Sequence, residues 1–349
     1  MKKFTRSILD WYEKGHRAFP WRETQDPYRI WISEIMLQQT RAETVVSYYN
    51  RFLERFPDVL SLAEAEEDSL MKAWEGLGYY SRARNLKKCA GQIVSAYGGH
   101  FPESAEELET LPGIGPYTAG AIASIAFDRR SAAVDGNVLR VMARVHCIEE
   151  DIKKQTTVLE ITREVEKLLP DTGCGTFTNA MMELGACICT PKHPDCASCP
   201  VEAFCKAKKE GRVDALPVRG REKEKKVEQR DVLLLFRGKQ VLVEKTETGL
   251  LRGLYTFPHG LACHIPQMLE RLGSQGIQAE YGQCAAQARH VFSHVIWEMN
   301  IHELTVRKAP HGAFFVDATQ LAELPMATAM KKARQICLAR MNDANGISM

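Results

Sequence analysis

The decapeptide LPGIGPYTAG, residues 111–120, joins two helical stretches through a glycine-rich turn and decides the local fold. Gly113 and Gly115 permit positive φ angles, and Pro116 suits the first position of the helix that follows. Backbone amides at the start of such a helix point outward and can bind a phosphate. The motif therefore predicts a helical hairpin in which Gly113 and Gly115 contact phosphate, although an ordinary tight turn has the same composition.

Around this hairpin, apolar residues recur mostly with helical period from residue 4 to about residue 187. One stripe that should be buried consists of Val138, Val141, Met142 and Val145. We find no convincing alternating strand before residue 205. The pattern predicts an all-α domain over residues 1–205.

The remainder of the chain has a different composition. Residues 206–230 hold ten basic and five acidic residues with few large apolar ones, so we expect a charged linker that cannot build a core. Beyond it, residues 231–244 have the pattern of a β-hairpin, 265–272 that of a helix and 291–304 that of a strand. Residues 231–349 are therefore predicted to form a smaller α+β domain.

The overall composition is globular and indicates no partner. An apolar fraction of 45% and a charged fraction of 26% exclude a disordered or collagen-like polymer. Up to Cys205 there are 29 acidic and 24 basic residues, so DNA binding by the first domain would depend on a local patch. No apolar run approaches the ~20 residues of a membrane span, and the basic N-terminus lacks a signal-peptide core. Eleven cysteines without an export signal then indicate a reducing compartment, so we expect a cytoplasmic protein, nucleoid-associated if bacterial.

Four cysteines crowd together near the end of the first domain with the spacing C-x6-C-x2-C-x5-C: Cys189, Cys196, Cys199 and Cys205. Four thiolates so close suit an iron–sulfur cluster or a tetrahedral zinc ion. Zinc sites more often use two C-x2-C pairs, and free buried cysteines are the remaining alternative. A site held only by a loop at the end of a domain is expected to be structural rather than redox-active.

Glu34 is predicted to lie on an apolar helix face, because its neighbours one turn away are Ile30, Trp31 and Leu37. Desolvation there favours the neutral acid, which could donate a proton near neutral pH. The alternative is a buried glutamate that is paired with an arginine such as Arg22.

Asp135 lies in the string VDGN, residues 134–137, directly before the stripe that begins at Val138. Asp135 or Asn137 could simply cap that helix, which is worth about 1 kcal/mol. Capping and catalysis are compatible, because an aspartate at a helix start would be held rigidly and ionised.

These motifs together resemble the MutY family of adenine DNA glycosylases. The resemblance rests on SEIMLQQT at 33–40, WEGLGYY at 74–80, the hairpin at 111–120, VDGN at 134–137 and the four cysteines, in that order along the chain. It implies a helix-hairpin-helix glycosylase domain with a [4Fe–4S] cluster. It also implies a second, MutT-like domain that recognises 8-oxoguanine.

The resemblance implies a role for each polar residue of the first domain. Glu34 would be the general acid that protonates adenine, and Asp135 would stabilise the cationic sugar. Tyr117 and Asn137 would orient Asp135, and Arg22 would position Glu34.

Other residues would contact the DNA opposite the extruded adenine. By resemblance, these are Gln39, Thr40, Leu77 and Tyr79. Core packing is the alternative for Leu77 and Tyr79.

The second domain carries a partial Nudix signature. Residues 249–258 resemble the approach to a Nudix motif, but Glu270 is the only carboxylate between residues 258 and 278. We therefore expect a domain that reads the lesion without hydrolase chemistry. Phe292, Ser293 and His294 resemble the family's lesion-reading loop, although such a tripeptide is usually just a turn.

Three alternatives remain at this point. The endonuclease III branch, which acts on oxidised pyrimidines, carries a Schiff-base lysine where this chain has Tyr117, and no lysine lies between Lys88 and Lys153. The chain could also be a non-catalytic iron–sulfur DNA-binding protein or a Nudix hydrolase. The favoured interpretation is a monomeric, monofunctional glycosylase that binds duplex DNA with adenine opposite 8-oxoguanine or guanine, and the sequence indicates no protein partner.

Overall fold

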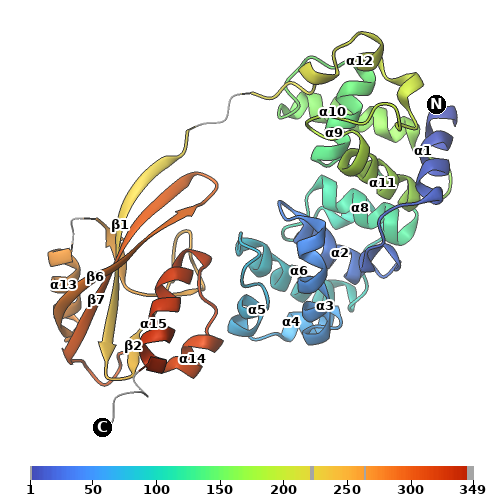
Figure 1. Cartoon of the computed structure of the whole chain (residues 1–349). Helices are drawn as coiled ribbons and strands as arrows, with labels where there is room; N and C mark the ends of the chain where they lie inside the picture. Colours follow the sequence, from blue (N-terminus) through green and yellow to red (C-terminus); the bar gives the residue numbers. More distant parts are fainter. Residues whose placement is uncertain (1, 221–223, 263–264, 344–349) are drawn as a thin grey trace. The chain divides into compact units, whose positions relative to one another are not determined.

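The computed structural model describes residues 2–220, 224–262 and 265–343 and divides the chain into two compact units (Figure 1). The first comprises Met1–Ala65 with Arg84–Arg221, and the second comprises Glu66–Ala83 with Glu222–Met349. A helical domain followed by a smaller domain with strands confirms the predicted fold class.

The first unit is built from helices and short helical turns. In chain order these are α1 (Lys2–Lys14), η1 (Pro20–Arg22), α2 (Pro27–Leu37), α3 (Ala42–Arg55), α4 (Val59–Glu64), most of α6 (Ser81–Tyr97), α7 (Ala105–Leu108), α8 (Pro116–Phe127), α9 (Gly136–His146), α10 (Gln155–Leu168), α11 (Cys174–Glu183), the π-helical turn η2 (Leu184–Ile188), η3 (Glu202–Phe204), α12 (Lys206–Lys209) and η4 (Val213–Ala215).

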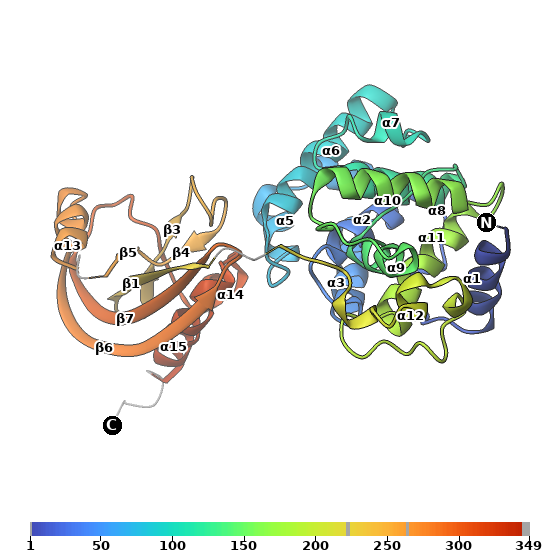
Figure 2. The ribbon, with the colours of Figure 1, turned by 90° about the horizontal axis from the view of Figure 1, so that it is seen from above.

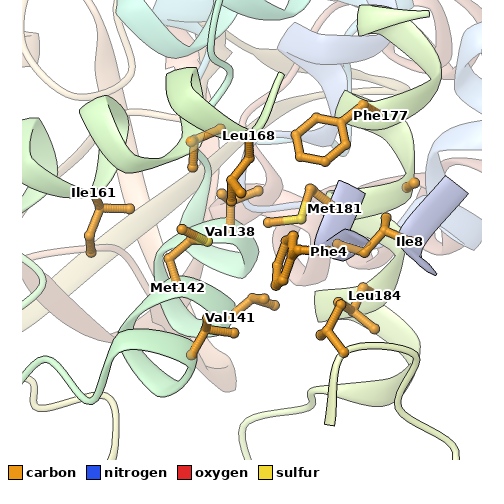
Figure 3. Close-up of a cluster of buried hydrophobic side chains, with 14 of the residues drawn as sticks. Phe4, Ile8, Val138, Val141, Met142, Ile161, Leu168, Phe177, Met181 and Leu184 are labelled. Carbon is orange, nitrogen blue, oxygen red and sulfur yellow. The ribbon is translucent and has the colours of Figure 1, made fainter. Parts of the chain in front are cut away.

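The predicted apolar stripe of α9 forms the centre of a hydrophobic core. Val138, Val141 and Met142 are at most 1% exposed. They pack among side chains of α1, α10 and α11, including Phe4, Ile161 and Phe177 (Figure 3). Burial of each such side chain contributes about 1.5–3 kcal/mol, so this cluster fixes α9 and the residues at its start.

The hairpin at residues 111–120 joins α7 to α8, with Pro116 at the first position of α8 as predicted. Gly113 has a φ of +80°, and a Cβ there would lie 2.7 Å from Asn85 Cβ. Gly115 does not use the positive φ that glycine permits. Gly115 is the N-cap of α8 with a φ of −100°, because a helix N-cap takes an extended conformation.

The charged stretch 206–230 is partly structured. Ala207 and Leu216 are buried, and the Leu216 carbonyl accepts a hydrogen bond from Arg144 Nε at 2.9 Å. This stretch supplies carbonyl acceptors for a buried guanidinium, which explains why a polar segment packs on the helices. Residues 221–223 lie outside the described residues, and β1 begins at Lys226, before the end of the predicted linker.

The second unit contains α5 (Glu67–Ala73) and a sheet with the order β6-β7-β1-β2-β8, in which β5 also pairs with β1. The strands are β1 (Lys226–Arg237), β2 (Gln240–Leu242), β5 (His259–Leu261), β6 (Gln278–Val291), β7 (Val295–Lys308) and β8 (Phe315–Val316), with a separate pair β3 (Glu244–Lys245) and β4 (Tyr255–Thr256). The helices are α13 (Ile265–Ser274), α14 (Ala318–Glu323), η5 (Thr328–Met330) and α15 (Lys331–Asp343).

The long antiparallel strands β6 and β7 curve together along one edge of this sheet (Figure 2). The predicted hairpin of β1 and β2 is present, and α13 covers the predicted helix. The strand expected over 291–304 starts at Val295 instead, because residues 292–294 form the turn between β6 and β7, closed by a 2.8 Å bond from Phe292 N to Val295 O.

Within the described ranges, no helix is both long and apolar enough to cross a membrane.

Candidate active site

One pocket in the first unit collects the predicted catalytic residues of the helical domain. We call it the Glu34 pocket. It is lined by all five predicted catalytic residues and by Gln39 and Thr40, together with Arg17, Phe19, Trp21, Leu37, Gln38, Arg41, Ala42, Glu43, Val134, Gly136, Asn179, Met182, Glu183 and Ala186. Segments far apart in the sequence therefore converge on one cavity.

Glu34 lies in the third turn of α2 and is 4% exposed. Burial raises its pKa to about 7, the negative charge of Asp135 adds to this, and the hydrogen bond from Tyr117 and the charge of Arg22 oppose it. The neutral acid that the apolar helix face predicts is therefore available near neutral pH.

Asp135 is the N-cap of α9. Its Oδ1 accepts hydrogen bonds from the amides of Asn137 at 2.9 Å and Val138 at 2.7 Å, and its Oδ2 accepts one from Asn137 Nδ2 at 2.7 Å. Burial raises the pKa of Asp135, while these bonds and the charge of Arg140 lower it. The expected orienting contact of Asn137 is present, but the pKa is raised, whereas a helix start alone predicts a lowered one.

Tyr117 and Arg22 make contacts that differ from the predicted ones. The Tyr117 hydroxyl donates to Glu34 Oε2 rather than to Asp135, whose two oxygens already accept bonds from the start of α9. Arg22 Nη2 donates to Glu183 Oε2 at 2.7 Å, and its Nη1 donates to the Arg17 carbonyl. Arg22 thus acts on Glu34 through its charge, since its guanidinium donates hydrogen bonds to Glu183 and to the Arg17 carbonyl.

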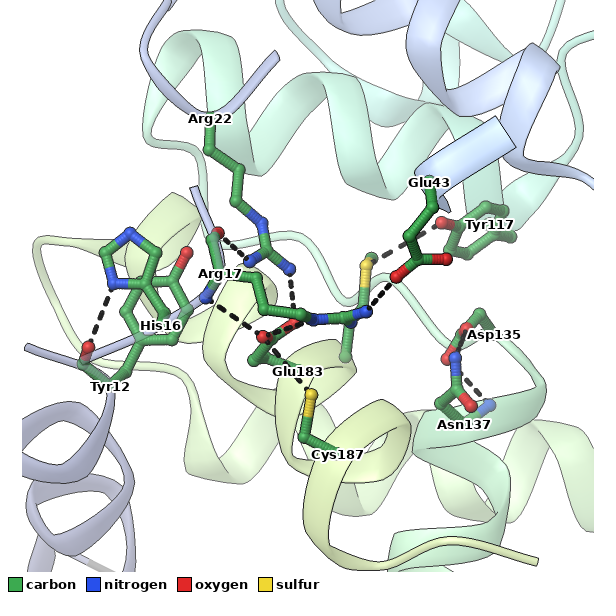
Figure 4. A network of polar contacts seen from close by, with 11 residues as sticks. Tyr12, His16, Arg17, Arg22, Glu43, Tyr117, Asp135, Asn137, Glu183 and Cys187 are labelled. Atoms are coloured by element: carbon green, nitrogen blue, oxygen red, sulfur yellow. Dashed lines mark hydrogen bonds and ion pairs between the residues drawn. The ribbon is translucent and has the colours of Figure 1, made fainter. Parts of the chain in front are cut away.

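Glu183 and Arg17 are parts of this network that sequence reasoning missed (Figure 4). The Glu183 side chain, at the end of α11, is 2% exposed. Burial raises its pKa, but hydrogen bonds from Arg17 and Arg22 bring it down to about 2, so Glu183 is ionised. Glu183 follows Met182, whose sulfur accepts a hydrogen bond from the Tyr117 hydroxyl, and only the folded chain shows that this end of α11 lines the pocket.

Arg140 connects Asp135 with the cysteine-rich loop. Its Nη2 donates to Asn137 Oδ1 at 2.8 Å and to the Gly185 carbonyl at 2.7 Å, and its Nε donates to the Cys189 carbonyl at 2.7 Å. A Cβ on Gly185 would lie 2.5 Å from Asn137 Cβ, so this close approach requires glycine.

The four cysteines of the C-x6-C-x2-C-x5-C motif line one pocket, the cysteine pocket, whose apolar wall includes Val141, Val145 and Leu184. Arg144 Nη1 donates to Cys189 Sγ at 3.3 Å. In the described part of the chain, no group of three or more His, Cys, Asp or Glu side chains converges closely enough to hold a metal ion. Four thiols around one pocket beside a guanidinium nevertheless form a donor set that fits a cluster with thiolate ligands.

Leu77 and Tyr79 lie in the second unit, where they share a pocket with Phe292 and Ser293. We call it the Tyr79 pocket. Leu77 is buried, whereas Tyr79 is 44% exposed with a φ of +47°. His294 is exposed beside it and lies 3.2 Å, Nδ1 to Oγ, from Ser293. Leu77 and Tyr79 thus line a pocket of the second unit, whereas Gln39 and Thr40 line the Glu34 pocket of the first unit.

Two families match the chain. Residues 32–170 match the family described as HhH-GPD superfamily base excision DNA repair protein, and residues 231–335 match the NUDIX domain. The chain is 32% identical to an adenine DNA glycosylase of Mus musculus, with 94% of this chain and 76% of the relative covered. It is also 36% identical to an adenine DNA glycosylase of Buchnera aphidicola, with 73% of each chain covered.

Solved structures resemble the helical part. A thermostable thymine-DNA glycosylase superimposes with a TM-score of 0.55 at 30% identity, covering 60% of this chain and 96% of its own. A trapped endonuclease III–DNA covalent intermediate, with a TM-score of 0.51 at 23% identity over 59% of this chain and 94% of its own, shares the fold. Together with the helical hairpin and the Glu34 pocket, these relatives show that the chain belongs to the adenine DNA glycosylase family, within the HhH-GPD superfamily of base excision DNA repair proteins.

Proposed function

We propose that this chain hydrolyses the N-glycosidic bond of adenine that is mispaired with 8-oxoguanine or guanine in duplex DNA. The observation that carries the proposal is that a buried carboxyl group, Glu34, and a partly buried one, Asp135, line one pocket with different hydrogen-bond partners. The names of the curated relatives supply the base, adenine.

The two carboxyl groups suit the two charges that develop in this reaction. Adenine is a poor leaving group unless it is protonated, and Glu34 with a pKa of about 7 holds a proton near neutral pH. The sugar becomes cationic as the base departs, and the Asp135 carboxylate, held by the amides of Asn137 and Val138, stabilises that charge. Tyr117 keeps its own proton, because burial and the charge of Glu34 raise its pKa, so it orients the acid as a hydrogen-bond donor.

The same residues support a monofunctional enzyme. A lyase that forms an imine with the sugar requires an amine nucleophile. Tyr117 occupies the hairpin position where the endonuclease III branch carries a lysine, and none of the described residues that line the Glu34 pocket is a lysine. Water rather than a protein amine then completes the reaction, and the DNA strand stays intact.

Recognition of the opposite base is assigned to the Tyr79 pocket. Leu77 and Tyr79 from one segment and Phe292 and Ser293 from the β6–β7 turn line it together. Aromatic rings and a hydroxyl suit a purine that must be stacked and hydrogen-bonded at its edge. The amides near Gly113 and Gly115 would hold a phosphate, and extruding the adenine would cost a few kcal/mol.

The four cysteines would hold a [4Fe–4S] cluster, with zinc as the alternative metal. Held by these four thiolates, a cluster would cross-link the loop between η2 and α12. Arg140 and Arg144, which bond to the carbonyl and the sulfur of Cys189, tie that loop to α9. We also expect a cytoplasmic, monomeric protein.

The test is single-turnover release of adenine from duplexes with adenine opposite 8-oxoguanine, guanine or thymine, analysed with and without alkali. We expect release opposite 8-oxoguanine and guanine, with strand breaks only after alkali. Tight binding without release would favour a non-catalytic DNA-binding protein, and strand breaks without alkali would favour a lyase.

A further inference from the structure

Glu183 is a buried carboxylate of the Glu34 pocket that the reaction described above does not use. It accepts hydrogen bonds from Arg17 Nε at 2.8 Å, from Arg17 Nη2 at 2.9 Å and from Arg22 Nη2 at 2.7 Å. The backbone amide of Arg17 donates to it as well, at 3.2 Å. One carboxylate thus holds two guanidinium groups at the wall of the pocket (Figure 4).

Both arginines also contact groups other than Glu183. Both guanidinium groups lie 5.1 Å from the centre of the Phe19 ring, and Arg22 Nη1 donates to the Arg17 carbonyl at 2.8 Å. The Arg22 side chain is 9% exposed, so water screens its charge poorly. Arg17 is 38% exposed and has a second partner, Glu43, whose side chain is 67% exposed.

The charge on Arg22 acts on Glu34. The groups that set the protonation of Glu34 are Tyr117 on α8, Asp135 at the start of α9 and Arg22 on η1. The other charged groups that line the same pocket are Arg17, Arg41, Glu43 and Glu183. Arg22 favours the ionised form of Glu34, which is the form that cannot donate a proton.

We propose that Glu183 is a positioning residue that clamps Arg17 and Arg22 and neutralises their charge, so that Glu34 keeps the proton that adenine release requires. The inference rests on the proposed function, because it assigns the residue that maintains the general acid of that reaction. Without the Glu183 charge, two guanidinium groups beside the pocket would favour ionised Glu34. Glu183 itself stays ionised and transfers no proton.

The experiment is the rate of single-turnover adenine release as a function of pH, measured on the full-length protein. We expect Glu183→Gln to move the alkaline midpoint of this profile to lower pH by half a unit or more, so that the rate is lost mainly above neutral pH. Glu183→Asp keeps the charge and should leave the midpoint in place, even where the rate falls. Glu103→Gln is the control, because it removes the exposed partner of Arg129 outside the Glu34 pocket, and the midpoint of this variant should not move.

A purely structural role for Glu183 predicts an equal loss of rate at every pH, and an unmoved midpoint in a folded Glu183→Gln variant would overturn the proposal. If that variant does not fold, Arg22→Gln tests whether the guanidinium charge acts on Glu34, and the expected shift of the midpoint is then in the opposite direction. Removal of the Arg22 charge should move the midpoint to higher pH, and a midpoint that stays or falls would contradict the proposal. A wild-type protein that releases no adenine would instead refute the proposed function, so the two failures are distinguishable.

Discussion

Tyr117, on the first turn of α8, donates a hydrogen bond from its hydroxyl to Glu34 Oε2 on α2. The helical hairpin that ends at Gly115, whose amides we propose to hold a phosphate, therefore also contributes to the Glu34 pocket. It also delivers the hydroxyl that orients the buried acid, because Tyr117 is the residue directly after Pro116.

This bond leads to a prediction for Tyr117→Phe. A hydrogen bond to the carboxylate stabilises the ionised form of Glu34, so its removal should raise the pKa of Glu34 above about 7. The alkaline midpoint of adenine release should then move to higher pH. The comparison is with Tyr12→Phe, whose ring lies outside the Glu34 pocket. Equal midpoints in Tyr117→Phe and the wild type would show that the hydroxyl does not act on Glu34.

Glu34 should also make stability depend on pH. Its folded pKa of about 7 exceeds the ordinary value of 4.5, so its contribution to stability is fully present below pH 4.5 and is lost as pH rises to 7. A shift of this size corresponds to roughly 3 kcal/mol. The free energy of unfolding of Glu34→Gln, taken relative to that of the wild type, should therefore rise by this amount between pH 4.5 and pH 7.5. Urea unfolding of both proteins at the two pH values measures this rise. If the difference between the two proteins is the same at both pH values, burial does not raise the pKa of Glu34.

The cysteine motif gives a prediction about metal content. Cys199→Ser should lower the iron bound per protein and the melting temperature, because Cys199 lines the cysteine pocket. Cys187→Ser is the matched control. Cys187 lies two residues before the motif, and its thiol donates a hydrogen bond to Glu183. The iron content of the Cys187→Ser protein should therefore equal that of the wild type. Full iron in Cys199→Ser would remove it from the ligand set, and zinc in place of iron would favour the alternative metal.

The β6–β7 turn gives a prediction about selectivity. Alanine at Ser293 and His294 should reduce the preference for 8-oxoguanine over guanine opposite adenine, while release opposite guanine changes little. Ser274→Ala, on the exposed end of α13, serves as the control. The measurement is the rate of adenine release opposite 8-oxoguanine divided by the rate opposite guanine. If this ratio equals that of the wild type, the β6–β7 turn does not read the lesion.

The sequence predicts the parts of this structure that depend on local patterns. The stripe at Val138, Val141 and Met142 has helical period, and the pairing of apolar neighbours around Glu34 follows from i±3 and i±4 spacing. Both are found as predicted. The β1–β2 hairpin is also found, because a short turn separates two apolar runs.

The parts that depend on tertiary partners could not be predicted. Nothing local indicates that Arg22 pairs with Glu183, which lies 161 residues further along the chain. Tyr117 binds Glu34 rather than Asp135, and no local pattern in the sequence distinguishes these two acceptors. Strand β6 escaped notice since its residues are mostly exposed and its register with β7 is interrupted by irregularities, so it lacks a clean alternation.

The most direct test of the central claim compares adenine release by the wild type, Glu34→Gln and Asp135→Asn on a duplex with adenine opposite 8-oxoguanine. Asparagine is also a good N-cap, so Asp135→Asn should keep α9 intact. We predict that each variant loses about 100-fold or more in single-turnover rate at pH 7 while it still binds the duplex. A near wild-type rate for Glu34→Gln would contradict the assignment of Glu34 as the general acid.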